Sequence, residues 1–162
     1  MNNQEQTKVL FVCMGNICRS PTADAVFKHH VSAAGLDHAL LVDSAGTHAY
    51  HIGNPPDERA QQAALRRGYK MHDLRARAVQ DSDFLNFDYI LAMDNDNLAG
   101  LNAQCPDQFS HKLSLFMTYS PNFSACPEVP DPYYGGSQGF ENVLDMVENA
   151  SQGLLAHIRK QF

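Results

Sequence analysis

Hydrophobic and polar positions along the chain follow two alternating patterns. Short apolar runs rich in β-branched and aromatic residues predict four strands, the last one weak, at 8–13, 40–42, 87–93 and 112–116. Apolar residues at helical spacing predict helices at 21–34, 57–67, 95–101 and 140–158. The segment 120–139 contains four prolines and three glycines, which indicates a loop.

Strands that alternate with helices favour an α/β fold, in which a parallel sheet carries helices on both faces. Such sheets bind ligands beyond the carboxyl ends of their strands. This rule directs attention to the loops at 13–20, 44–50 and 93–96. Because the chain has no internal repeat or long linker, we expect a single domain over 1–162, with a flexible polar N-terminus at 1–7.

Composition narrows the class of protein. Of the 162 residues, 44% are hydrophobic and 19% are charged, which is typical of a folded protein. No apolar run approaches the roughly 20 residues that cross a bilayer, and the polar segment 1–7 lacks the features of a secretory signal. The four cysteines are therefore expected to be reduced thiols in the cytoplasm. A net charge of −6 argues against nucleic acid or a membrane surface as a partner.

The segment 13–20 combines residue types that can bind and attack a phosphate group. Cys13 ends a predicted buried strand, Gly15 allows a tight turn, and Arg19 precedes a helix start. The free N–H groups and positive dipole end of that helix, together with the planar guanidinium of Arg19, would form an anion site. A cysteine in this field is expected to be a thiolate, which is a nucleophile for phosphorus.

Asp131 is a second candidate for the chemistry. It lies between Pro130 and Pro132, and two prolines restrict the backbone, so its carboxylate sits on a stiff loop. A positioned carboxylic acid would help to expel the leaving group of a phosphate ester by protonating it. After that step the same carboxylate could act as a base on water.

Four segments resemble the low-molecular-weight protein tyrosine phosphatases. The sequence VCMGNICRSP at 12–21 is similar to the phosphate loop of that family, with Met14 as a mild variation. The sequences DSAG at 43–46, FDYILAMD at 87–94 and DPYY at 131–134 are similar to its second strand end, third strand and acid loop. The resemblance implies a four-stranded parallel sheet with helices on both faces and a phosphate-binding loop after the first strand. It also implies hydrolysis of phosphotyrosine through a phosphocysteine, without metal or cofactor.

The same resemblance implies roles for single residues. Cys13 would be the nucleophile, Arg19 the phosphate clamp and Asp131 the general acid. The other residues of the phosphate loop (residues 13–20), its support and the pocket walls would be Met14, Gly15, Asn16, Ile17, Cys18 and Ser20, then Ser44, then Tyr50 and Tyr133. Proteins that contain phosphotyrosine would be the substrates, and a cognate tyrosine kinase is a candidate partner. Tyr133 and Tyr134 match a pair that can be phosphorylated in family members.

Two departures from the family pattern stand out. Leu74 fills a place where the family often has a histidine that bonds to the loop support, and we interpret the nearby His72 as a surface residue. Tyr50 stands where the family often has tryptophan. Cys18 lies close enough to Cys13 in sequence for a disulfide that would protect the nucleophile from irreversible oxidation.

Three alternatives to a tyrosine phosphatase stay open. A thioredoxin-coupled arsenate reductase would need two further relay cysteines, and residues 79–96 contain none. A non-catalytic phosphate-binding module is disfavoured by the joint presence of Cys13, Arg19 and Asp131. Arginine phosphatases that resemble the family carry threonine at the position of Ile17, so isoleucine there predicts a preference for phosphotyrosine.

Overall fold

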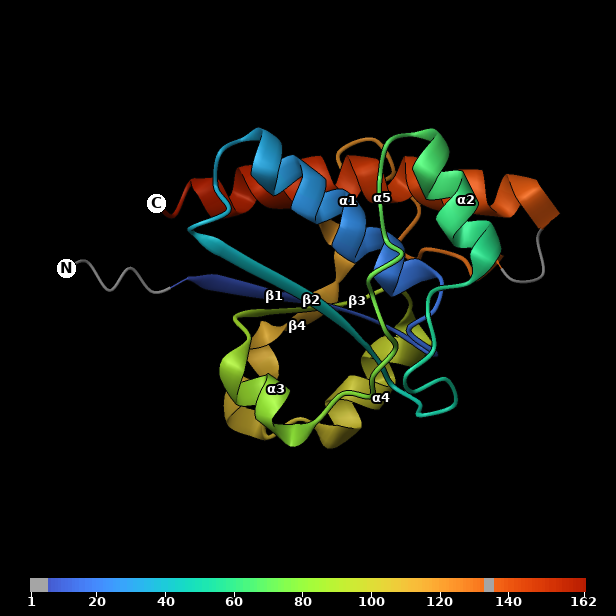
Figure 1. Cartoon of the computed structure of the whole chain (residues 1–162). Helices are drawn as coiled ribbons and strands as arrows, with labels where there is room; N and C mark the ends of the chain where they lie inside the picture. The colour runs from blue at the N-terminus through green and yellow to red at the C-terminus, as the bar shows by residue number, and fades with distance from the viewer. Residues whose placement is uncertain (1–5, 133–135) are drawn as a thin grey trace.

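Four parallel strands form one sheet in the computed structural model, which describes residues 6–132 and 136–162. The strands, in the sheet order β2-β1-β3-β4, are β2 (Leu40–Gly46), β1 (Thr7–Cys13), β3 (Tyr89–Ala92) and β4 (Leu113–Leu115). Helices cover both faces of this sheet (Figure 1). The predicted fold class is therefore confirmed.

The helices divide into two layers. One face of the sheet carries the helices α1 (Arg19–Ala33), α2 (Glu58–Arg66) and α5 (Gly136–Arg159), and the other carries α3 (Asp81–Asn86) and α4 (Asn95–Gln104) (Figure 1). Two short 3₁₀ helices, η1 (Asp107–Lys112) and η2 (Phe116–Tyr119), flank β4. No helix in the two described ranges is long and apolar enough to traverse a bilayer.

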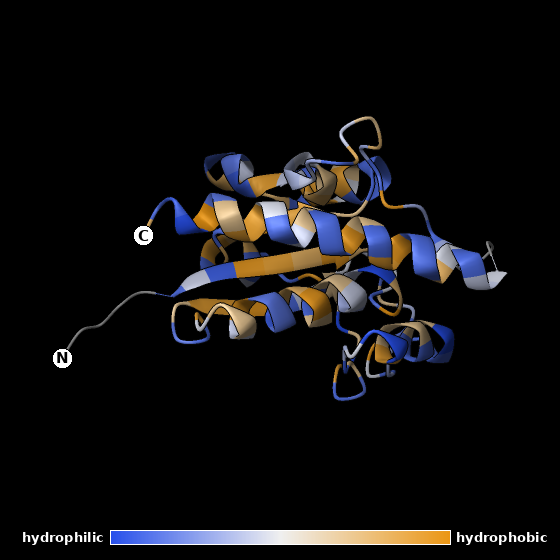
Figure 2. Cartoon of the chain, turned by 90° about the horizontal axis from the view of Figure 1, so that it is seen from above, coloured by the Kyte–Doolittle hydropathy of each residue, from blue (hydrophilic) through white to orange (hydrophobic). Residues whose placement is uncertain are grey.

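The alternation of side chains along β1 builds the two halves of the core. Val9, Phe11 and Cys13 point into the larger cluster with α1, α2 and α5, whereas Leu10 and Val12 point into the smaller cluster on the opposite face. All of these residues are buried, so β1 is hydrophobic without interruption from Val9 to Cys13 (Figure 2). This central strand ends at Cys13, which fixes that residue at the edge of the core.

The strand order determines where a ligand can bind. From β1 the chain passes to β2 on one side and later returns to β3 on the other, so the two crossovers separate at the carboxyl end of β1. A crevice opens at such a switch point. The loop after β1 also runs close to the end of β2, since a Cβ atom on Gly46 would lie 2.8 Å from the carbonyl oxygen of Met14. Only glycine fits there.

Several local predictions need correction. The helix α3 and both 3₁₀ helices were not predicted, because elements of four to six residues show too little periodicity. The loop expected over 120–139 ends earlier, since α5 begins at Gly136. Thr7 already belongs to β1 rather than to a flexible terminus, while residues 1–5 of that predicted terminus lie outside the described residues.

Candidate active site

The phosphate loop wraps around the sulfur atom of Cys13. Asn16 adopts a φ of 58°, which turns the chain back so that its own N–H donates to Cys13 Sγ at 3.3 Å. The hydroxyl oxygen of Ser20 lies 3.0 Å from the same sulfur. Cys13 is only 3% exposed. The sulfur therefore sits at the floor of the loop, and its polar contacts are groups that can donate to an anion.

The helix α1 adds its amino terminus to this loop. It begins at Arg19, and its N-cap residue, Cys18, makes no side-chain capping hydrogen bond. The first N–H groups of a helix lack partners within the helix, and here the residues before them form the phosphate loop. These groups and the helix dipole favour an anion at that position.

Arg19 connects the phosphate loop to two other segments. Its Nη1 atom donates to Asp94 Oδ2 at 2.6 Å and to the Val129 carbonyl oxygen at 3.0 Å. Burial opposes the charge of Arg19, but Cys13 and Asp94 outweigh it and raise its pKa, so the side chain stays a guanidinium. Asp94 follows β3, and Val129 lies two residues before Asp131. Arg19 thus holds the segment that carries Asp131 beside Cys13.

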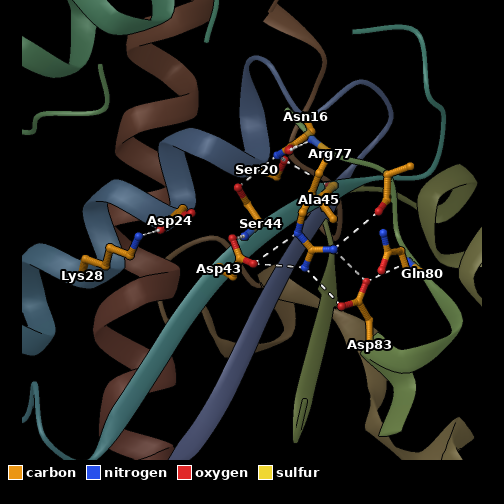
Figure 3. A network of polar contacts seen from close by, with 11 residues as sticks. Asn16, Ser20, Asp24, Lys28, Asp43, Ser44, Ala45, Arg77, Gln80 and Asp83 are labelled. Atoms are coloured by element: carbon orange, nitrogen blue, oxygen red, sulfur yellow. Dashed lines mark hydrogen bonds and ion pairs between the residues drawn. The ribbon is translucent and has the colours of Figure 1, made fainter. Parts of the chain in front are cut away.

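A second layer of hydrogen bonds supports the loop from below (Figure 3). The Asn16 side-chain nitrogen donates to Ser20 Oγ at 2.8 Å and to Ser44 Oγ at 3.0 Å. Its side-chain oxygen accepts from the backbone N–H of Arg77 at 3.0 Å. All four polar functions of this amide and its serine partners are buried, so Asn16 is held in one orientation.

Arg77 anchors this second layer to the rest of the fold. Its guanidinium forms ion pairs with Asp43 on β2 at 3.1 Å and with Asp83 on α3 at 3.0 Å (Figure 3). Its carbonyl oxygen accepts from the backbone N–H of Gly46 at 2.8 Å. These contacts fix the segment that presents the Arg77 N–H to Asn16.

A cavity of about 260 Å³ opens above the sulfur. Its lining residues are Cys13, Met14, Gly15, Ile17, Cys18, Arg19, His51 and Asp131. The structure therefore brings the predicted nucleophile, clamp and acid to one cavity, although the acid is separated from the other two by more than 110 positions. Asn16, Ser20 and Ser44 lie in the hydrogen-bonded layer beneath it.

Tyr50, one of the two tyrosines predicted to form the walls of the pocket, does not line the cavity. Tyr50 is 72% exposed and stacks on His48 with ring centroids 5.2 Å apart, and the adjacent His51, rather than Tyr50, lines the cavity. Tyr133 and Tyr134 lie outside the described residues. The role of Tyr50 and Tyr133 as pocket walls stays a prediction.

The four cysteines differ in setting. All are free thiols, and of the four only Cys13 and Cys18 line the cavity. Burial, followed by the negative charge of Asp57, raises the pKa of Cys18 to about 12, so Cys18 is a protonated thiol at neutral pH. Within the described ranges, no group of three His, Cys, Asp or Glu side chains could hold a metal ion.

Three contributors to the site were not predicted from the sequence. The position of ligand sites at the carboxyl ends of parallel strands indicates the loop at 93–96, but this rule does not distinguish Asp94 from the other residues of the loop. Arg77 and His51 lie in irregular segments with no local signal. The interpretation of His72 as a surface residue is confirmed, since its side chain is 66% exposed. Leu74 is partly buried and packs against the larger core cluster.

Comparisons with known proteins agree with this arrangement. The model of the low molecular weight phosphotyrosine protein phosphatase family matches residues 8–162. A low molecular weight phosphotyrosine protein phosphatase of Schizosaccharomyces pombe is 46% identical over 153 residues, which cover 93% of this chain and 96% of that protein.

Solved structures give the same result. A crystal structure of a protein tyrosine phosphatase from Entamoeba histolytica has a TM-score of 0.93 and 44% identity, and the match covers 96% of this chain and 99% of that one. A crystal structure of a Drosophila arginine phosphatase has a TM-score of 0.85 and 35% identity, and covers 94% and 98%. As its four motifs predicted, the chain belongs to the low-molecular-weight protein tyrosine phosphatase family.

Proposed function

We propose that this chain hydrolyses phosphotyrosine in proteins through a phosphocysteine intermediate, with Asp131 as the general acid. The observation that carries the proposal is the cavity that Cys13, Arg19 and Asp131 line together. A nucleophile, a fixed cation and a carboxyl group around one small space are the three groups that transfer of a phosphoryl group from an aryl ester needs.

In the first step, the phosphate group occupies the loop, where backbone N–H groups and Arg19 bind its oxygens. The lone pair of Cys13 Sγ attacks phosphorus and forms the S–P bond while the bond from phosphorus to the tyrosine oxygen breaks. Asp131 gives its proton to that oxygen, so tyrosine leaves as a neutral phenol. The charge on the transferring group stays on oxygens that already face Arg19.

In the second step, water attacks the phosphocysteine. Asp131, now a carboxylate, accepts a proton from the water as the O–P bond forms. The S–P bond breaks, its electron pair returns to Cys13, and inorganic phosphate is released. The Asn16 N–H and the Ser20 hydroxyl contact the sulfur, so both are placed to stabilise the thiolate that leaves.

The depth of the cavity bears on the substrate class. Cys13 is nearly fully buried, so phosphorus must reach the floor of the loop. A phosphotyrosyl side chain is long and flat enough to do so, whereas phosphoserine would bring its backbone against the rim. A cavity of about 260 Å³ is also smaller than the ~300–1,000 Å³ of pockets that enclose whole small molecules. Both points favour a protein side chain as the substrate.

Phosphoarginine is the second candidate substrate, because an arginine phosphatase is among the similar structures. Ile17 lines the cavity and offers no hydrogen bond, whereas the arginine phosphatases that resemble the family carry threonine there. The test is kcat/KM for phosphotyrosine, phosphoserine and phosphoarginine in matched peptides, with the wild type and Ile17→Thr. We expect phosphotyrosine to be the best wild-type substrate and Ile17→Thr to shift preference toward phosphoarginine. Phosphoarginine as the best wild-type substrate would contradict the proposal.

Oxidation offers a further expectation for this site. Hydrogen peroxide should oxidise the Cys13 thiolate to a sulfenic acid, whose hydroxyl group leaves as water when the Cys18 thiol condenses with it to form the S–S bond. The resulting disulfide should be reversed by dithiothreitol, so wild-type activity should return. Cys18→Ser should keep most activity but lose it irreversibly after peroxide. Peptide mass spectrometry checks the bridge, and its absence from the oxidised wild type would refute the protective role.

We further propose that the enzyme works in the cytoplasm, where a reduced Cys13 persists and tyrosine kinases supply the substrates. A cognate tyrosine kinase is the partner that this chemistry requires, since only such an enzyme forms the aryl phosphate that the site would consume.

A further inference from the structure

The segment 47–57, which leads from β2 to α2, lies against the phosphate loop. Three of its backbone N–H groups donate to carbonyl oxygens of that loop: Thr47 to Cys13 at 2.9 Å, His48 to Met14 at 3.0 Å and Asp57 to Ile17 at 2.8 Å. None of these three donor residues lines the cavity. Any effect that they have on a bound phosphate group therefore passes through the loop.

Peptide geometry converts each of these contacts into a direction for the next N–H group. In a trans peptide unit the C=O and the N–H of the following residue point in opposite directions. The described residues contain no cis peptide bond. A carbonyl that is held toward the segment 47–57 therefore turns the next N–H away from that segment. The N–H groups that are directed in this way belong to Met14, Gly15 and Cys18.

These three N–H groups have the environment of an anion site. Met14, Gly15 and Cys18 all line the cavity. Among the residues that the structure describes, none accepts a hydrogen bond from their N–H groups. Between them in the chain, the Asn16 N–H donates to Cys13 Sγ at 3.3 Å, so it faces the floor of the same cavity. Several N–H groups directed into one space form a nest that binds an anion.

We propose that three backbone N–H groups, those of Thr47, His48 and Asp57, are positioning groups for the phosphate site. They hold carbonyl oxygens of the loop away from the cavity and so keep the following N–H groups directed into it. This inference rests on the proposed function, because it concerns how the loop binds the phosphate group of the substrate. The three donors touch no substrate atom and act only through the loop.

The segment can impose these directions because its own position is fixed. In its middle, the Gly53 N–H donates to the Ala76 carbonyl oxygen at 2.8 Å, and the Ala76 N–H donates to the Asn54 carbonyl oxygen at 2.9 Å. At its end, the Asp57 side chain accepts from the Arg59 N–H at 2.8 Å and so caps α2. The donors are therefore held by contacts that do not involve the phosphate loop.

The test removes one N–H group at a time by changing a backbone amide to an ester, which deletes the donor and keeps every side chain. The full chain is made by cell-free translation with the α-hydroxy acid analogue at His48 or at Asp57. The matched control has the ester at Gly53, whose N–H belongs to the same segment but donates to Ala76, outside the phosphate loop.

Three quantities are measured on each protein. The Kd of inorganic phosphate is obtained from the protection that phosphate gives Cys13 against alkylation by iodoacetamide, followed by peptide mass spectrometry. Steady-state assays with a phosphotyrosine peptide give kcat and KM. The melting temperature reports the stability of the fold.

We expect the ester at His48 and the ester at Asp57 each to weaken phosphate binding about threefold to tenfold, which corresponds to the loss of one backbone hydrogen bond. The value of kcat should fall as well, because the same N–H groups bind the transferring phosphoryl group in the transition state. The ester at Gly53 should lower the melting temperature about as much as the other two but keep the wild-type Kd for phosphate. A merely structural role of the donors would not separate phosphate binding from stability in this way.

Wild-type phosphate binding in both the His48 ester and the Asp57 ester would overturn the inference. An equal loss of phosphate binding in the Gly53 ester would also overturn it, since the effect would then come from a general loosening of the segment. Phosphate binding needs no turnover, so the two hypotheses can fail separately. If the wild type does not hydrolyse phosphotyrosine peptides but the three esters change the Kd as expected, the proposed function fails and the role of the donors stands.

Discussion

Cys13→Ser should abolish turnover of phosphotyrosine peptides while inorganic phosphate still binds. The serine hydroxyl is not ionised at neutral pH, so the variant has no nucleophile, and we expect kcat to fall by at least about 10³-fold. The anion site depends on other groups, namely the backbone N–H groups of the loop, the amino terminus of α1 and the guanidinium of Arg19. All of these remain. Steady-state assays measure the loss, and isothermal titration with phosphate measures the binding.

Cys126→Ser is the matched control, because Cys126 is exposed and lies outside the cavity. It should keep wild-type kcat and wild-type phosphate binding. Residual steady-state turnover in Cys13→Ser that is free of wild-type protein would remove Cys13 from its role as the nucleophile. Loss of phosphate binding along with turnover would mean that the sulfur itself holds the loop in shape.

The sheet could be predicted because its strands carry local signals. A run such as 8–13 is apolar at every position after Lys8, which is typical of a strand with both faces covered, and the structure has β1 there. The 3₁₀ helices could not be predicted in the same way. Segments such as Phe116–Tyr119 pack against α5 and the larger core cluster, and their own sequence has no period that would specify a helix.

The residues of the site also differ in whether the local sequence predicts them. The residues of the phosphate loop are contiguous, so one short motif names nearly all of them. Asp94 and Arg77 contribute through contacts that only the folded chain creates, with Arg19 in one case and Asn16 in the other. Their partners lie 75 and 61 positions away, and no local pattern reports such pairs.

The Arg19 contacts also show how an exposed loop can hold the proposed general acid in a fixed position. Asp131 is exposed, yet the segment that carries it is fixed just before it: the Val129 N–H donates to the Met93 carbonyl oxygen at 2.8 Å and the Val129 carbonyl accepts from Arg19. Pro130 and Pro132 restrict the backbone on either side of the acid. The carboxyl group therefore has a defined position without being buried, and it remains open to the substrate.

Asp131→Asn should slow the hydrolysis of phosphotyrosine strongly and the hydrolysis of aryl phosphates with acidic phenols much less. Tyrosine must be protonated as it leaves, because its phenol has a pKa near ~10, and loss of a general acid costs about 10²–10⁴-fold. An acidic phenol leaves as a stable anion and needs no proton. The measurement is kcat/KM for a series of aryl phosphates, plotted against the pKa of the leaving phenol for the wild type and Asp131→Asn.

Glu128→Gln is the control for this series, since Glu128 is an exposed carboxylate of the same loop that does not line the cavity. Its plot should coincide with the wild-type plot, which is expected to be nearly flat because the acid compensates for poor leaving groups. The Asp131→Asn plot should fall steeply toward less acidic phenols and approach the wild type at the acidic end. A parallel loss at every phenol would show that Asp131 only shapes the loop and does not protonate the leaving group.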